Sequence, residues 1–390
     1  MAIKVFDHPV GHTSTVPATA GQKVVLFVRE RDGHSGPPGA RKAVLMLHGR
    51  SVPVLAGFDL QYKSYSWADA LAKQGYDVFM MDLQGSGRSP RPRMEDPCNV
   101  NPALHKTLLT PNPLSGQRTP SYPFQLNNSQ SDWDELDTVV EFIRNLRHVA
   151  KIAFIGWSAA SFQMGPYSIM NPDKVESLFL LAPMFPPLGA ANPPPVLPAP
   201  GFPTHVFTQQ GFTESWTAQV HCANQRETGI ENVVWEACMD NDPIGRTWGK
   251  IESGRPIGLS RFRNAVWWGW NTATASQGGV LGTRVPILIA YGEYDTTANT
   301  TPPSSNPLLN FSVPALYKAV PGPHKLVVKM ACAGHQPIWE GQHKNVHDMS
   351  AHWLKHTKLD GKTQGRFVMD ENGSLSPEPE PSVPSVPHLA

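Results

Sequence analysis

A serine between an apolar strand and a helix is the residue of this chain best suited to do chemistry. Residues 151–160 read KIAFIGWSAA, which predicts a buried strand that runs into a tight turn at Ser158. A serine hydroxyl becomes an effective nucleophile when a sharp strand-to-helix turn holds it exposed beside a base. That turn crowds the backbone and needs small residues two positions before and after the serine, and Gly156 and Ala160 meet this need, although a second glycine is commoner than alanine. We therefore predict Ser158 as a nucleophile; the alternative is a serine that caps a helix.

The elements that must position this serine follow from the apolar pattern. Several β-rich runs, among them AVLML, KIAFI and VPILIA, are apolar almost throughout, as are strands covered on both faces. Helical spacing of apolar residues or good terminating residues predict helices over 64–74, 131–147 and 338–355. This alternation predicts an α/β fold with a mostly parallel, eight-stranded sheet flanked by helices. The expected strands span 3–7, 23–29, 43–47, 77–81, 152–155, 177–181, 286–290 and 325–330.

About a hundred residues between the expected strands at 177–181 and 286–290 break the alternation of strands and helices. They begin with prolines and contain the six tryptophans Trp216, Trp235, Trp248, Trp267, Trp268 and Trp270. This span is too long for a loop, so we predict a cap over 184–280, inserted between core parts at 1–183 and 281–360. A proline-rich stretch at 90–123 is expected to be a second excursion. The proline-rich end, 376–390, has little to bury and is expected to be a disordered tail.

Composition narrows the classes of function. The formal net charge of +1 leaves no basic footprint for nucleic acid or an anionic membrane, and no apolar run approaches the roughly 18 residues that span a bilayer. Asp7 and His8 interrupt the region where a signal peptide would be apolar, so the cytoplasm is the expected location. The four cysteines lack metal-ligand spacing. Cys222 and Cys238 could pair in an oxidising compartment, but free thiols are expected.

Five segments together resemble the α/β-hydrolase superfamily over roughly residues 23–355. They are VLMLHG at 44–49, YDVFMMDLQGSGRS at 76–89, IGWSAA at 155–160, ILIAYGEYD at 287–295 and CAGHQ at 332–336. In that fold the catalytic acid follows a late strand and the histidine follows the last one, in the chain order Ser, Asp, His. The resemblance therefore implies Asp295 as the acid and His335 as the base that takes and returns the serine proton.

Other acids and histidines fit these roles less well. Glu293 lies two residues before Asp295 and would point to the opposite side of an extended chain. His324 precedes the last strand, at the wrong end, whereas His343 and His347 fall in a predicted helix and are expected to be solvated. Asp82 ends a strand where the superfamily usually uses an aspartate to shape a turn.

Acyl transfer also needs donors aimed at the developing oxyanion. The backbone N–H of Ala159, directly after the nucleophile, is one candidate. By resemblance the second comes from the turn after the third strand, with Arg50 first and Ser51 second. The side chain of Arg50 could also bind a substrate carboxylate or simply face solvent, and the sequence leaves both open. Together with the cap, Trp157, Trp267 and Trp268 are candidates to contact substrate, because α/β sheets bind ligands beyond the carboxyl ends of their strands.

The expected function is hydrolysis of a carboxylic ester, lactone or thioester through an acyl-enzyme, with no cofactor and no metal. The aromatic cap favours a bulky or apolar small-molecule substrate. The alternatives are an acyltransferase or a C–C bond hydrolase, which use the same three residues. A dehalogenase or epoxide hydrolase would carry aspartate in place of Ser158, and a pure binding module would generally lack one of the three. The sequence leaves the oligomeric state open.

Overall fold

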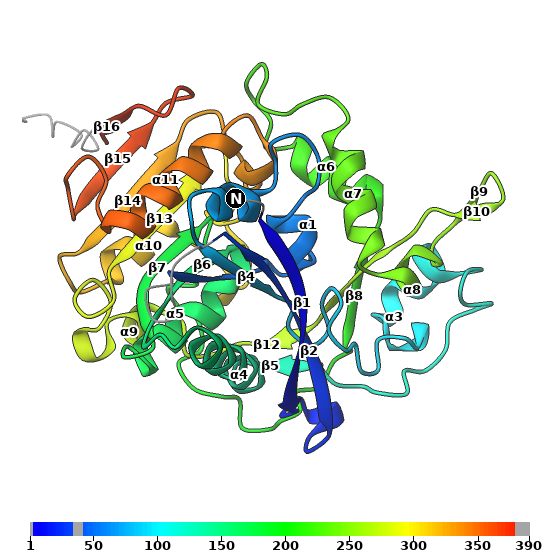
Figure 1. The fold of residues 1–390 in the computed structure, drawn as a ribbon. Coiled ribbons are helices and arrows are strands. Elements are labelled where there is room, and N and C mark those ends of the chain that lie inside the picture. Colours follow the sequence, from blue (N-terminus) through cyan, green and yellow to red (C-terminus); the bar gives the residue numbers. More distant parts are fainter. Residues whose placement is uncertain (1–2, 34–41, 379–390) are drawn as a thin grey trace, which may run out of the picture.

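The computed structural model describes residues 3–33 and 42–378, and its centre is a ten-stranded sheet (Figure 1). The strand order is β1-β2-β4-β3-β6-β7-β13-β14-β15-β16. All eight expected strands are present in it, as β1 (Lys4–Thr13), β2 (Lys23–Asp32), β3 (Ala43–Leu47), β4 (Asp77–Met81), β6 (Ile152–Trp157), β7 (Val175–Leu181), β13 (Ile287–Gly292) and β14 (Lys325–Met330).

Two further strands make the sheet ten-stranded rather than eight-stranded. β15 (Gly365–Met369) pairs parallel with β14, and β16 (Leu375–Pro377) pairs antiparallel with β15. Both are short and only partly buried, so they lack the apolar runs that mark the central strands. The predicted tail of 376–390 begins inside β16, and residues 379–390 lie outside the described residues.

The sheet is mostly parallel, as expected. From β4 to β15 every neighbouring pair is parallel, whereas the pairs β1–β2 and β2–β4 at one edge and β15–β16 at the other are antiparallel. Every residue of β3, β4, β6 and β13 is buried, which explains why these segments are apolar almost throughout. Parallel strands bring their carboxyl ends to one edge of the sheet, and the loops after β3, β6, β13 and β14 meet there.

Helices cover both faces of the sheet (Figure 1). On one side α2 (Trp67–Lys73) packs against α11 (His343–His356), and the Trp67 indole donates to Ser350 Oγ at 2.8 Å. On the other side α4 (Ser129–Arg147) packs against α5 (Ser161–Met170). Helix α4 begins two residues before the predicted 131 because Asn128 and Ser131 cap it reciprocally. The sheet-covering part also contains α1 (Val54–Phe58) and α10 (Val313–Ala319), whereas α3 (Pro102–Leu104) lies in the proline-rich stretch at 90–123, beside α8 (Figure 1).

The last predicted helix is shorter than expected. The span 338–355 divides into a 3₁₀ turn, Pro337–Trp339, and α11. The expectation that His343 and His347 are solvated is wrong, since they are 8% and 4% exposed. His343 stacks on Tyr65, just before α2, and His347 stacks on Trp67, the first residue of α2. Amphipathic spacing did not separate these buried histidines from surface ones.

The long segment between β7 and β13 carries many short elements to one side of the sheet (Figure 1). It packs with the proline-rich stretch at 90–123 around a small apolar cluster that is separate from the main core. In that cluster Val100, Leu109 and Leu114 meet Val206, Trp248 and Leu259. The boundaries 184–280 for a cap remain a prediction. The elements here are β8 (Thr204–Phe207), α6 (Gln209–Thr217), α7 (Ile230–Asp240), α8 (Pro243–Arg246), β9 (Ile251–Glu252), β10 (Arg255–Pro256), β11 (Ser260–Arg263), β12 (Ala265–Val266), which pairs with β5 (Asn127–Asn128), and α9 (Thr272–Ala275).

Within the described residues, none of the helices has both the length and the apolar character needed to cross a bilayer.

Candidate active site

Ser158 lies at the sharp turn that its neighbours predicted. β6 ends at Trp157, Ser158–Ala160 forms a 3₁₀ turn, and α5 follows directly. Ser158 has a φ of +57°, a backbone conformation that residues other than glycine rarely adopt. A Cβ on Gly156 would lie 3.0 Å from the sulfur of Met164 and 3.2 Å from the Cβ of Ala160. The turn thus leaves no room for larger residues on either side of the serine.

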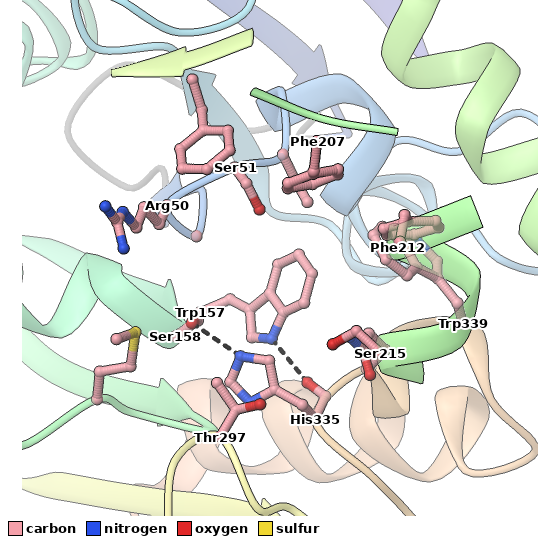
Figure 2. A pocket seen from close by; sticks show the side chains of 16 residues that line it. Arg50, Ser51, Trp157, Ser158, Phe207, Phe212, Ser215, Thr297, His335 and Trp339 are labelled. Atoms are coloured by element: carbon pink, nitrogen blue, oxygen red, sulfur yellow. Dashed lines mark hydrogen bonds between the residues drawn. The ribbon is translucent and has the colours of Figure 1, made fainter. Parts of the chain in front are cut away.

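The structure brings Ser158, His335 and Asp295 into one hydrogen-bonded chain (Figure 2). His335 Nε2 lies 2.8 Å from Ser158 Oγ, and His335 Nδ1 lies 3.0 Å from each carboxylate oxygen of Asp295. All three residues are buried, at 6%, 6% and 3% exposure for Ser158, His335 and Asp295. This arrangement can pass the serine proton to Nε2 while the carboxylate holds the imidazole by its Nδ1–H.

The carboxylate of Asp295 is fixed by its own loop. Its Oδ1 accepts hydrogen bonds from the backbone N–H groups of Thr297 at 3.0 Å and Ala298 at 2.7 Å. The rival acid Glu293 instead accepts from the backbone N–H of Cys332 at 3.3 Å, and it is exposed. Asp82 accepts from the N–H groups of Val54 and Arg88, so it shapes a turn as expected.

The turn after β3 lies directly against the nucleophile. A Cβ on Gly49 would be 3.2 Å from the Cβ of Ser158. His48 braces this turn, because its Nδ1–H donates to Gly49 O at 2.6 Å while Nε2 accepts from Leu83 N at 3.3 Å. Among the described residues, the amides of Arg50 and Ala159 have no acceptor outside helices and strands. Both amides are therefore free to donate, and their role as oxyanion donors stays a prediction.

A cavity of about 340 Å³ opens onto Ser158 and His335. Its walls are mainly apolar and aromatic, and the rings come from both the sheet and the long segment between β7 and β13 (Figure 2). The lining residues that the sequence did not single out include Met184, Phe207, Phe212, Ser215, Phe262, Thr297, Gln336 and Trp339. Most of them lie in a segment whose elements gave no clear periodic signal, so only its placement over the sheet reveals them.

Of the three tryptophans predicted to contact substrate, the structure brings Trp157 alone to this cavity. Trp267 and Trp268 are not among the described residues that line it. The ring of Trp267 stacks on Phe162 at 4.4 Å, and Trp268 lies edge-on to Trp133 at 6.1 Å. These two tryptophans therefore join the segment to α4 and α5.

Residues from the long segment also hold the loop of His335. Gln219 Oε1 accepts from the backbone N–H of His335 at 3.1 Å, and the Trp157 indole donates to His335 O at 3.0 Å. One residue earlier, Gly334 N donates to Glu340 at 2.7 Å, and Glu340 also accepts from the Trp216 indole at 2.8 Å. Burial raises the pKa of Glu340 to about 7, although these donors favour its charged form.

A disulfide fastens the same loop. Cys222 and Cys332 are bonded, with 5.7 Å between their Cα atoms, whereas Cys98 and Cys238 are free. The expectation that all four are thiols is wrong, and so is the alternative pair of Cys222 with Cys238. Cys332 lies only three residues before His335. Because disulfides persist mainly in oxidising compartments, this bond weighs against the cytoplasmic location, which stays a prediction.

Comparison with known proteins agrees with this fold. A family model described as alpha/beta hydrolase fold matches residues 42–342, which is more than half of the chain. The chain therefore belongs to the α/β-hydrolase family, which confirms the resemblance and the fold class. A search of curated proteins gave no match.

The solved structures that resemble this chain have low sequence identity to it and moderate structural similarity. An esterase from Thermogutta terrifontis is 14% identical with a TM-score of 0.48, covering 90% of this chain and 99% of its own. Carboxylesterase CesB from Bacillus subtilis is 10% identical with a TM-score of 0.49, covering 92% and 93%. A 2-hydroxy-6-oxo-6-phenylhexa-2,4-dienoate hydrolase from Rhodococcus is 13% identical with a TM-score of 0.44, covering 91% and 100%. At these scores none of the three decides what this chain acts on.

Proposed function

We propose that this protein is a serine hydrolase that cleaves a carboxylic ester, lactone or thioester of a bulky, apolar small molecule. The observation that carries the proposal is the hydrogen-bonded chain of Asp295, His335 and Ser158 at the mouth of an apolar cavity. His335 takes the Ser158 proton as Oγ attacks the carbonyl carbon, and then gives that proton to the leaving alcohol. Water, activated by the same imidazole, attacks the acyl-enzyme and releases the acid.

The oxyanion that forms in each step needs donors. The amides of Arg50 and Ala159 supply these donors. Gly49, directly before Arg50, lies against Ser158, and Ala159 follows Ser158 in the 3₁₀ turn. The charge that develops on the carbonyl oxygen is thereby stabilised without a metal ion or cofactor taking part.

The first experiment labels the protein with a fluorophosphonate and locates the modified residue by mass spectrometry. Modification of Ser158 is the expected result. The Ser158→Ala variant should keep the wild-type circular dichroism spectrum and lose label and nearly all turnover of p-nitrophenyl esters. A variant that retained substantial esterase activity would overturn the assignment.

Chain length tests the size of the substrate. Because aromatic rings line the cavity, kcat/KM should rise from the acetate to the hexanoate and longer p-nitrophenyl esters. A preference for acetate would contradict this part of the proposal. Adding an alcohol acceptor and analysing the products distinguishes hydrolysis from acyl transfer, and a vinylogous diketone substrate tests C–C bond cleavage.

A further inference from the structure

Arg50 is a half-buried arginine, and among the described residues it has no acidic partner. Among the described residues no hydrogen bond or ion pair reaches its guanidinium, and its Nε is shielded from solvent without an acceptor. The guanidinium carbon lies 5.3 Å from the ring centre of Phe262 and 5.9 Å from that of Trp267. Burial and the positive charge of Arg263 lower the pKa of Arg50, and no carboxylate offsets this. Two aromatic faces hold the cation but leave its hydrogen-bonding capacity unused.

The neighbouring buried arginines differ from Arg50 in this respect. Arg263 forms a two-pronged ion pair with Asp132, with 3.0 Å between Nη2 and Oδ2. Arg261 pairs with Asp242, with 3.0 Å between Nε and Oδ2. Burying a charge is costly unless it is paired, so this part of the molecule generally supplies a carboxylate for each guanidinium. Arg50 is an exception, and it is the one that lies at the reaction centre.

Arg50 lies in the turn beside the reacting serine. The residue lines the cavity and lies on the same side of it as Ser158, across from Phe212 and Ser215 (Figure 2). The described lining contains no aspartate, glutamate or lysine, so no protein group there competes for the guanidinium. Under the proposed function the backbone N–H of Arg50 donates to the oxyanion, so the oxyanion donor and the carboxylate-binding group belong to one residue.

We propose that the Arg50 guanidinium binds a carboxylate of the substrate, so that the natural substrates are esters or lactones that join an apolar body to a free carboxylate. This inference rests on the proposed function. A planar guanidinium can give two parallel N–H···O bonds to a carboxylate, and the surrounding rings exclude water that would weaken them. The carboxylate then fixes how far the scissile carbonyl lies from Ser158. The substrate carboxylate thus takes the place that Asp132 and Asp242 take for the neighbouring arginines.

The test uses two p-nitrophenyl esters of equal length, one ending in a carboxylate and the other in the corresponding methyl ester. For the wild type, kcat/KM should be about 10- to 100-fold higher for the carboxylate, the range expected for hydrogen bonds between charged groups. Arg50→Met should remove most of this ratio, and Arg50→Lys should keep part of it. Arg284→Met is the matched control, because Arg284 is an exposed arginine that pairs with Asp173 on the surface.

Two results would overturn the inference. One is a wild-type ratio of one or less. The other is an equal loss for both esters in Arg50→Met, which would mean that Arg50 only shapes the oxyanion turn. Failure of the proposed function looks different, because Ser158 would then escape fluorophosphonate labelling. Even in that case, calorimetry on Ser158→Ala with the carboxylate ester and its methyl ester decides the inference, and equal affinities would refute it.

Discussion

At the scale of residues, the proposed proton path depends on a carboxylate that its own loop immobilises. Asp295 receives two backbone N–H groups as well as the imidazole, so it can hold only one tautomer of His335. Asp295→Asn would place an N–H donor where the imidazole also donates. We expect kcat for p-nitrophenyl butyrate to fall about 10⁴-fold, as for the equivalent change in serine proteases, with an unchanged thermal midpoint.

Glu293→Gln is the control for that variant, since Glu293 faces away from the imidazole and should change kcat less than about twofold, the scale of a surface substitution. If Asp295→Asn kept a tenth of the activity, Asp295 would not be the orienting acid.

The three candidate catalytic residues could be predicted from the sequence because each one follows a recognisable strand. Ser158 follows β6, Asp295 follows β13 and His335 follows β14, and the parallel sheet gathers these ends. Phe207 and Phe212 carry no comparable signal. Their presence in the cavity depends on how a hundred-residue segment lies over the sheet, which is a matter of long-range packing rather than local pattern.

At the scale of elements, the loop before α11 is held from outside the sheet. The Cys222–Cys332 disulfide spans 110 residues of chain, and a crosslink of this length restricts the unfolded state strongly. Cys222→Ser should therefore lower the free energy of unfolding by about 2–5 kcal/mol. It should also lower kcat, because Cys332 begins the turn that carries His335.

Urea denaturation measures the stability, with and without dithiothreitol. Reduced wild type should unfold like Cys222→Ser, and Cys98→Ser, which removes a free thiol, should differ little from wild type. If dithiothreitol did not change the unfolding transition of the wild type, the disulfide would either not form or not contribute to stability.

Local pattern located the central elements better than their connections. The bounds of β3, β4 and β14 match the predicted ranges because each strand has an apolar centre, VLML, VFMM and LVV respectively. β15 and β16 lie beyond the last strong helix and are half-exposed. The pairing of four cysteines cannot be deduced from their spacing alone, so the disulfide could be assigned only once the fold was known.

At the scale of the whole molecule, a buried acid makes stability depend on pH. Glu135 in α4 accepts from the backbone N–H and the side-chain amide of Gln84, each at 2.8 Å. Burial, together with the charge of Asp132, raises the pKa of Glu135 from its ordinary value of 4.5 to about 8. The folded state thus binds one more proton than the unfolded state between these values, so stability should fall as pH rises from about 5 to 8 and then level off.

Glu135→Gln removes this titration. The difference in unfolding free energy, wild type minus variant, should decrease by on the order of 3 kcal/mol from pH 5 to pH 8 in urea denaturation. Glu141 lies on the same helix, but Lys174 lowers its pKa, so Glu141→Gln should give a difference that is flat over this range. A flat difference for Glu135→Gln would mean that Glu135 is ionised throughout.

The small cluster shared by residues 90–123 and the segment after β7 has a consequence for how this protein can be recombined. Val100 and Leu109 have their partners, Val206, Trp248 and Leu259, on the far side of a hundred residues of sequence. A chimaera that borrows only the later segment would leave those three side chains facing water and invite aggregation. The two stretches therefore have to be exchanged together. A homologue that donates its pocket to another protein must contribute both of them.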